Sequence, residues 1–266
     1  MKIKETYKTK EKIMNNSLTE EQVKVLNMSQ SVINEVRKVI IGKDEIIIKV
    51  LLSILAGGHI LIEDIPGVGK TTLAVALSKA LSLDYKRLQF TPDVLPTDVT
   101  GFTILNKETH KFEYKQGAAL TNLFLADEIN RTSSKTQSAL LEVMEEGKVT
   151  VDGITHKMPD PYIVIATQNP VGSIGTQMLP ESQMDRFIVR LTMGYPNIES
   201  EVAMLKSKQN LVPVDNVRPV VSAEDILQAR KVVENIYVSD QVFQYIVMLA
   251  NATRNNEYIK LGLSPR

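Results

Sequence analysis

The sequence of 266 residues contains no cysteine and no tryptophan, and aromatic residues make up only 5% of it. Without cysteine, this chain can form no disulfide and no cysteine metal site, and thiol catalysis is excluded. Its charge is balanced, with 31 basic and 31 acidic residues. The total therefore gives no support to a surface built for polyanions, although a local patch would be hidden in that sum.

Long hydrophobic runs are also missing. The most apolar stretch, residues 46–56, contains Lys49 and is too short to span a bilayer. The N-terminus, "MKIKETYKTKEKIMNN", lacks the apolar core of a signal peptide. We therefore expect a cytoplasmic protein without membrane insertion. Because 43% of the residues are hydrophobic, the chain can bury a sizeable core.

Strand-like runs alternate with helical patterns through the first two thirds of the chain. Apolar residues recur at helical spacing from Val25 to Val39 and again over residues 46–56. A further helix is expected at "SSKTQSALLEVMEEG", followed by a hairpin at Asp152-Gly153. The runs that predict strands are "GGHILIED", "RLQF", "LFLAD", "IVIAT" and "FIVRL". Such an alternation predicts an α/β fold with a parallel sheet covered by helices on both faces.

The same patterns divide the chain into three regions. Residues 1–18 are charged and show no period, so we expect a flexible tail. Residues 19–194 carry the α/β alternation. Beyond "GYPN" the pattern is mostly helical, over residues 198–209, 224–236 and 240–254. We therefore predict a second, helical domain over residues 195–266, with the boundary near Tyr195.

The stretch "IEDIPGVGKTTLA" ends an apolar run and opens a helix. The strict phosphate-loop pattern, G-x-x-x-x-G-K-[ST], would have glycine at position 64, where this chain has Asp64. Gly67 and Gly69 still allow close approach of the backbone to a phosphate, and Lys70 supplies a positive charge. Thr71 offers a hydroxyl to Mg²⁺. A sharp turn alone would explain the glycines but not the Lys-Thr pair. The predicted nucleotide-binding residues of this loop are Pro66, Gly67, Val68, Gly69, Lys70, Thr71 and Thr72.

An acidic pair follows the strand-like run in "LFLADEIN". Asp127 would hold Mg²⁺, directly or through water, and Glu128 would orient or deprotonate the attacking water. Taken alone, such a pair is equally compatible with a solvated strand end. Its occurrence together with the phosphate loop favours the catalytic interpretation.

Two further polar residues fit a hydrolase. Asn169 ends another strand-like run and would hydrogen-bond the water or the γ-phosphate, or else simply begin a turn before the next proline. Arg186 would reach a phosphate on a neighbouring subunit as an arginine finger, or else form a local ion pair with Asp185 or Glu181. Arg131 is an alternative candidate for the finger.

Several long motifs together resemble the MoxR family of AAA+ ATPases. They are "DIPGVGKT", "QFTPDVLPTDVTG", "LADEINRTSSKTQSALLEVMEEGKVTVDG", "IATQNP", "LPESQMDRF" and "GLSPR", and the resemblance runs from about Val25 to Arg266. It implies a P-loop NTPase core with a parallel five-stranded sheet and a small C-terminal helical lid. It also implies a ring, usually a hexamer, with ATP and Mg²⁺ bound between subunits.

The resemblance assigns roles to individual residues of this chain. It places Gly67, Gly69, Lys70 and Thr71 in the Walker A loop, Asp127 and Glu128 in Walker B, and Asn169 at sensor 1. Arg186 matches the arginine finger, Arg266 matches the sensor 2 residue that contacts the γ-phosphate, and Ile40, Ile41 and Gly42 match the segment along the adenine. Because the chain stops at Arg266, where a further lid helix would begin, we expect the lid to be incomplete.

The implied function is ATP hydrolysis that drives remodelling or assembly of a protein client, often with a partner that carries a von Willebrand factor A domain. "DVTGFTILNKETHKFEYKQG" and "KVTVDGITHKM" resemble two inserts that face the pore or a client. A nucleic-acid motor and a metal-chelatase motor are the alternatives. Basic residues of the inserts would attract phosphates, but the scarcity of aromatic residues argues against nucleic acid. These residues are Lys107, His110, Lys111, Lys115, Lys148, His156 and Lys157.

Overall fold

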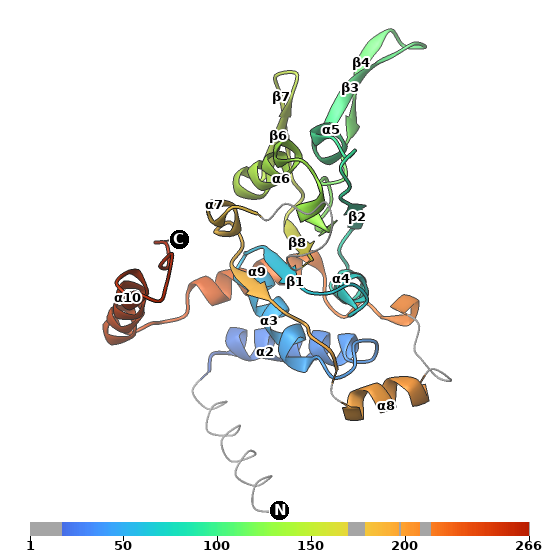
Figure 1. Cartoon of the computed structure of the whole chain (residues 1–266). Helices are drawn as coiled ribbons and strands as arrows, with labels where there is room; N and C mark the ends of the chain where they lie inside the picture. Colours follow the sequence, from blue (N-terminus) through green and yellow to red (C-terminus); the bar gives the residue numbers. More distant parts are fainter. Residues whose placement is uncertain (1–17, 170–178, 197, 208–213, 266) are drawn as a thin grey trace, which may run out of the picture.

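The structure is a computed structural model that describes residues 18–169, 179–196, 198–207 and 214–265 (Figure 1). Its centre is a parallel five-stranded sheet with the strand order β2-β5-β8-β1-β9. The strands are β1 Ile60–Glu63, β2 Tyr85–Gln89, β5 Leu123–Asp127, β8 Ile163–Gln168 and β9 Val189–Leu191. Each overlaps one of the predicted strand-like runs. The predicted α/β fold with a five-stranded parallel sheet is therefore confirmed.

Helices cover both faces of the sheet, and each face has its own apolar core. Along β5, Leu123 and Leu125 face one core, while Phe124 and Ala126 face the other, as the two-residue period of a strand requires. The first core is completed by α2 Glu20–Val36, α3 Asp44–Leu55, α4 Lys70–Ala80 and α9 Ala223–Glu234. The second is completed by α5 Pro96–Thr100 and α6 Ser134–Glu146.

The ends of α2 and α6 follow from local sequence. The Thr19 hydroxyl accepts the Gln22 amide at 3.2 Å, and the Gln22 side chain accepts the Thr19 amide at 3.0 Å, which forms a capping box. At the start of α6 the Ser133 hydroxyl accepts the Thr136 amide at 3.3 Å, and Gly147 ends the helix with a φ of +60°. The predicted helix over this segment is confirmed.

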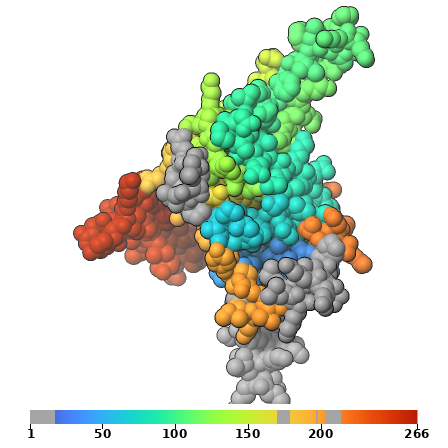
Figure 2. Space-filling model, turned by 45° about the vertical axis from the view of Figure 1, so that its right-hand side comes forward, coloured from blue at the N-terminus to red at the C-terminus, as the bar shows by residue number. Residues whose placement is uncertain are grey.

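Two hairpins project from one end of the molecule (Figures 1 and 2). The first pairs β3 Gly101–Asn106 with β4 Lys111–Gln116, and the second pairs β6 Lys148–Val151 with β7 Ile154–Lys157. The rings of Tyr114 and His156 join them, stacked at 3.9 Å between centroids. The second hairpin turns at Asp152-Gly153, as predicted.

The C-terminal helices differ in how they contact the sheet region. In α9, Ile226 and Ala229 are buried in the first core, together with Val217 and Val221. Two more helices, α8 Ile198–Ser207 and α10 Asp240–Arg254, extend from the body, and α10 has no buried residue. Within the described part of the chain, no helix is both long and apolar enough to cross a membrane. The domain division near Tyr195 stays a prediction.

Candidate active site

The phosphate loop joins β1 to α4 through backbone that favours glycine. Gly67 has a φ of +87° and Gly69, the N-cap of α4, has a φ of +96°. A Cβ at Gly67 would meet no atom within 4 Å, so the backbone conformation, rather than space, requires glycine there. No side chain caps the start of α4. Its first amides are therefore available to an anion, which the helix dipole also favours.

Lys70, the first residue of α4, is only 7% exposed. Its ammonium donates a hydrogen bond to the backbone oxygen of Asp64 at 2.6 Å. Burial lowers the pKa of Lys70, and the nearby charges of Asp127, Asp64 and Glu128 oppose this effect. The lysine thus sits among acidic groups at the base of the loop.

Asp127 ends β5, and both of its carboxylate oxygens accept hydrogen bonds. Oδ1 accepts the Thr167 hydroxyl at 2.6 Å. Oδ2 accepts two bonds from the Arg87 guanidinium, from Nη2 at 2.7 Å and Nε at 3.1 Å. Sequence reasoning missed Arg87 and Thr167. Arg87 lies on β2 and Thr167 on β8, the two strands that pair with β5. Nothing in the sequence around either residue marks it as a partner of Asp127, because the strand pairing brings them together.

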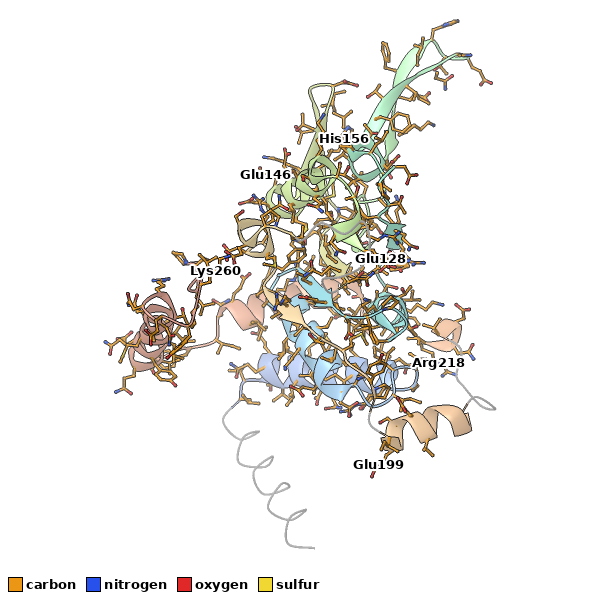
Figure 3. The ribbon with its side chains drawn as sticks, viewed as in Figure 1. Glu128, Glu146, His156, Glu199, Arg218 and Lys260 are labelled. Atoms are coloured by element: carbon orange, nitrogen blue, oxygen red, sulfur yellow. The ribbon has the colours of Figure 1, made fainter. Side chains whose placement is uncertain are left out.

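Glu128 follows directly and has a φ of +58°. Its Oε1 accepts a hydrogen bond from Asn169 Nδ2 at 2.9 Å, and its Oε2 accepts from Arg131 Nη1 at 2.7 Å and Gln89 Nε2 at 3.3 Å. Burial raises the pKa of Glu128, but the hydrogen bonds from Arg131, Asn169 and Gln89 outweigh it, so the pKa is lowered. Glu128 is therefore an ionised carboxylate at neutral pH, close to the ends of the strands (Figure 3).

Asn169 follows β8 and is 5% exposed. Asn130 fixes its backbone, because the Asn169 amide donates to Asn130 Oδ1 at 3.3 Å and Asn130 Nδ2 donates to the Asn169 carbonyl at 3.1 Å. The side-chain oxygen of Asn169 is buried and has no hydrogen-bond partner among the described residues. An unsatisfied buried acceptor of this kind indicates a missing donor, such as a water or a ligand.

The phosphate loop, the acidic pair and Asn169 line one cavity of about 320 Å³. It opens at the carboxyl ends of β1, β5 and β8, where ligands bind in parallel α/β sheets. The lining residues are Pro66, Gly67, Gly69, Lys70, Thr71, Thr72, Arg87, Gln89, Asp127, Glu128 and Asn169. The structure thus brings together most of the residues expected from the two halves of the predicted site. Of the predicted loop residues, Val68 does not line the cavity.

The other predicted site residues lie elsewhere. Arg186 forms an ion pair with Glu145 of α6 and lies outside the cavity. Among the described residues it makes no ion pair with Asp185 or Glu181. The alternative prediction of a local ion pair therefore named the wrong acidic partner. Arg131 contacts Glu128 of its own chain. Arg266 lies outside the described residues.

Ile40, Ile41 and Gly42 form the turn between α2 and α3 and do not line the cavity. Ile40 is 6% exposed and belongs to the first core. Gly42 has a φ of +73° and faces α8, where Ser200 Oγ would lie 2.2 Å from an added Cβ. A contact of these residues with adenine stays a prediction.

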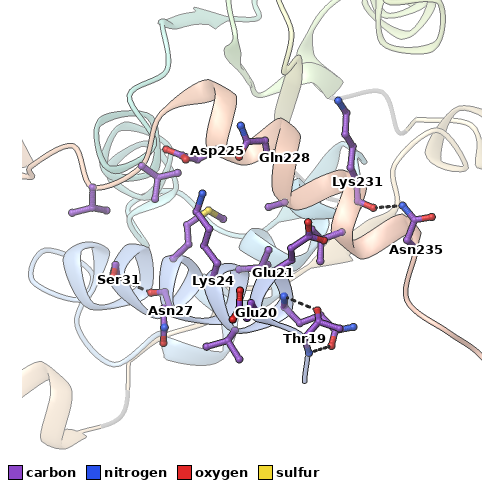
Figure 4. Close-up of a pocket in the computed structure, with 18 residues that line it drawn as sticks. Thr19, Glu20, Glu21, Lys24, Asn27, Ser31, Asp225, Gln228, Lys231 and Asn235 are labelled. Carbon is purple, nitrogen blue, oxygen red and sulfur yellow. Dashed lines mark hydrogen bonds between the residues drawn. The ribbon is translucent and has the colours of Figure 1, made fainter. Parts of the chain in front are cut away.

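A larger groove, of about 960 Å³, lies between α2 and α9 (Figure 4). Charged and polar side chains from both helices line it, among them Lys24, Asp225 and Lys231. None of the predicted site residues does so. Size alone therefore does not identify the candidate site.

The residues at the small cavity suit a nucleotide with Mg²⁺. Uncapped amides and Lys70 match phosphate oxygens, and Thr71 with Asp127 offers oxygen ligands of the kind that Mg²⁺ prefers. Among the described residues, no three or more His, Asp or Glu side chains form a metal cage. This composition fits a magnesium ion held by one or two protein oxygens and by the substrate's phosphates.

Comparison with known proteins gives consistent results. Residues 59–189 match the family described as "ATPase family associated with various cellular activities (AAA)". The chain is 49% identical to the uncharacterized protein YeaC of Bacillus subtilis over 88% of this chain and 73% of that protein. It is 36% identical to Chaperone MoxR1 of Mycobacterium tuberculosis over 87% of this chain and 63% of that protein. A crystal structure from Cytophaga hutchinsonii, described as that of a "putative ATPase", superimposes with a TM-score of 0.81 at 41% identity, over 88% of this chain and 71% of that one.

Proposed function

Because the chain belongs to the MoxR family of AAA+ ATPases, we propose that the cavity beside the phosphate loop is where it binds and hydrolyses ATP. One observation carries this assignment: the uncapped start of α4, Lys70, Thr71, the acidic pair and Asn169 all line the same space. The strands that deliver these groups are neighbours in the sheet. Each group therefore acts on the same substrate.

The phosphate loop binds the triphosphate. The amides of the loop and of the first turn of α4 hold the phosphate oxygens, and the Lys70 ammonium contacts the β- and γ-phosphates. Thr71 and Asp127 would hold Mg²⁺, which would neutralise charge on the phosphate groups. Arg87 pairs with Asp127 in this structure. A metal bound at Asp127 would therefore either share the carboxylate with Arg87 or displace the guanidinium.

Glu128 acts as the general base. Its lowered pKa keeps it ionised, so one of its oxygens accepts the proton of the attacking water. Asn169 donates to Glu128 and still has a free buried oxygen, which suits a residue that positions the water between the base and the γ-phosphate.

The active form is a ring, a homo-hexamer, in which a neighbouring subunit completes each site. Arg186 does not line its own cavity, which suits an arginine finger that acts in trans. Ile40, Ile41 and Gly42 contact the adenine, and Arg266 contacts the γ-phosphate. Arg131 pairs with Glu128, which lines the cavity of its own chain, whereas Arg186 pairs with Glu145 of α6, which does not. This difference favours Arg186 as the finger.

The ring remodels or assembles protein clients in the cytoplasm, with a von Willebrand factor A domain protein as the partner of this class. The name of Chaperone MoxR1 supports a protein client. The two projecting hairpins expose large apolar side chains, Phe112 at 78% and Ile154 at 64%, which a client segment would cover.

The direct test replaces the base while leaving the phosphate loop intact. Glu128→Gln should bind a fluorescent ATP analogue as tightly as the parent and hydrolyse ATP at least about 100-fold more slowly, since it removes the proton acceptor. Glu224→Gln, which removes an exposed acid in the first turn of α9, is the matched control and should hydrolyse ATP normally. Parent-like hydrolysis by Glu128→Gln would reject the assignment of the base.

A further inference from the structure

Asp64 occupies the position where the strict phosphate-loop pattern has glycine, and its side chain is buried, with 6% of the residue exposed. Its Oδ1 accepts the Ile65 amide at 2.8 Å, and its Oδ2 accepts the Gly194 amide at 2.6 Å. Its backbone oxygen accepts the Lys70 ammonium at 2.6 Å. One residue therefore contacts both the lysine of the phosphate loop and a segment 130 positions away.

That segment, residues 193–195, connects β9 to α8. Besides the bond to Asp64, it accepts three bonds from one ammonium: Lys43 Nζ donates to the carbonyls of Met193 at 2.6 Å, Gly194 at 2.9 Å and Tyr195 at 2.8 Å. Gly194 has a φ of +62°, a conformation that favours glycine. The connector is thus held from two sides, by a carboxylate at the end of β1 and by an ammonium at the start of α3.

We propose that Asp64 is a positioning residue that couples phosphate binding at Lys70 to the β9–α8 connector. The proposal rests on ATP binding in the cavity described above. A glycine at position 64 would offer the same backbone oxygen to Lys70, but it has no carboxylate for Gly194. Aspartate in place of glycine therefore adds a hydrogen bond to the connector and leaves the backbone bond to Lys70 unchanged.

The coupling follows from competition for one ammonium. Phosphate oxygens and the Asp64 carbonyl both accept from Lys70, so a bound triphosphate weakens or removes the bond to Asp64. The Asp64 peptide is then free to reorient. Because the carboxylate of the same residue is bonded to Gly194, this reorientation reaches the connector, and through it α8.

A purely structural role makes a different prediction. If Asp64 only ties the connector down, its loss would raise hydrogen exchange at residues 190–195 to the same extent with and without nucleotide. If Asp64 couples the two sites, its loss removes the difference between the two states. The change caused by nucleotide, rather than the exchange rate itself, is therefore the quantity to measure.

The experiment measures hydrogen exchange of peptides that cover residues 190–195, in the full chain with Mg²⁺, with and without a non-hydrolysable ATP analogue. We expect the parent exchange rate to change at least about threefold on nucleotide binding. Asp64→Gly, which creates the strict motif, should bind a fluorescent ATP analogue within about threefold of the parent and lose this change. Asp64→Asn keeps one acceptor oxygen and should show a reduced change, which guards against a folding failure of the glycine variant. Asp84→Gly, at an exposed residue before β2, is the control and should respond as the parent does.

Three results would overturn the inference. The first is a parent that binds nucleotide without any change in exchange at residues 190–195, and the second is a full change in either Asp64 variant. The third is a loss of nucleotide affinity of more than about tenfold in Asp64→Gly, which would place Asp64 in the phosphate site itself. A parent that fails to bind nucleotide at all would instead reject the proposed function. The two failures are therefore distinguishable.

Discussion

At the scale of single residues, the two acids of the site are satisfied by donors from the same chain. Arg87 and Thr167 hold Asp127, while Arg131, Asn169 and Gln89 hold Glu128. A buried carboxylate without such partners would lose stability or take up a proton. The donors therefore orient both acids before any ligand arrives, and those of Glu128 also keep that carboxylate ionised.

His59 makes stability depend on pH. Its Nδ1 accepts the Val164 amide at 3.1 Å, so the neutral ring carries its proton on Nε2, which faces the Met144 carbonyl at 3.1 Å. Burial lowers the pKa of His59; the Met144 contact opposes this, and the charge of Arg230 adds to it. Protonation at Nδ1 would also break the bond to Val164.

Because the folded-state pKa of His59 lies below the unfolded value, the unfolded chain binds the proton first as the pH falls. The stability contributed by neutral His59 is fully present above about pH 7 and declines as the pH drops through about 6.5 towards the folded-state pKa. Urea unfolding at several pH values should show this decline in the parent and a shallower one in His59→Gln. His110→Gln, at an exposed hairpin residue, should keep the parent slope. Identical slopes in the parent and His59→Gln would contradict the account.

Where a motif specifies the chemistry, the sequence alone was enough to select residues that lie together. Lys70, Thr71, Asp127 and Glu128 were placed by residue type and by their position after apolar runs, and the structure brings all four to one cavity. Arg87 and Gln89 could not be found in this way. Their relation to the acids depends on the register of β2 against β5, in which Gln89 lies opposite Asp127, and one sequence does not reveal strand pairing.

At the scale of elements, the main sheet was predictable because its three central strands, β5, β8 and β1, are short and apolar and because helical patterns separate the strands. The pairing of β3 with β4 is different. Its strands have mixed polarity, with Phe102 opposite Lys115 and Ile104 opposite Glu113, so alternation gave no clear strand signal and the segment was interpreted only as an insert. The hairpin of β6 and β7 was predicted because Asp152-Gly153 specifies a tight turn.

The packing of α9 determines whether the C-terminal region unfolds with the sheet. Ile226 is 1% exposed and lies in the core shared with α2, α3 and α4. We expect Ile226→Ala to lower the free energy of unfolding by about 2–5 kcal/mol, because it removes buried methyl groups and leaves a cavity. Ile236→Ala, at a residue that is 49% exposed, should change it by about 0.5 kcal/mol or less. Urea denaturation measures both.

The same experiment tests the domain division near Tyr195. If α9 belongs to one cooperative unit with the sheet, Ile226→Ala shifts the single unfolding transition of the sheet region. If residues 195–266 fold as an independent domain, the variant should split the transition and leave the part that reports on the sheet unchanged.

At the scale of the whole molecule, the position of Arg186 outside its own cavity has a consequence for assembly. In a ring, each cavity would receive Arg186 from the next subunit. Lys70→Ala and Arg186→Ala rings should each be nearly inactive. Random mixing in equal amounts should restore about a quarter of the parent ATPase activity, because one interface in four then has an intact Lys70 facing an intact Arg186. Mixed rings of confirmed composition without any recovered activity would contradict a finger in trans.

The most direct measurement of the central claim is an experimental structure of Glu128→Gln with ATP and Mg²⁺. The account predicts the triphosphate on the amides of residues 67–72, with Lys70 at its terminal phosphates and a cation between the Thr71 hydroxyl and the Asp127 carboxylate. A nucleotide bound at another place, or a cation in contact with neither Thr71 nor Asp127, would contradict it.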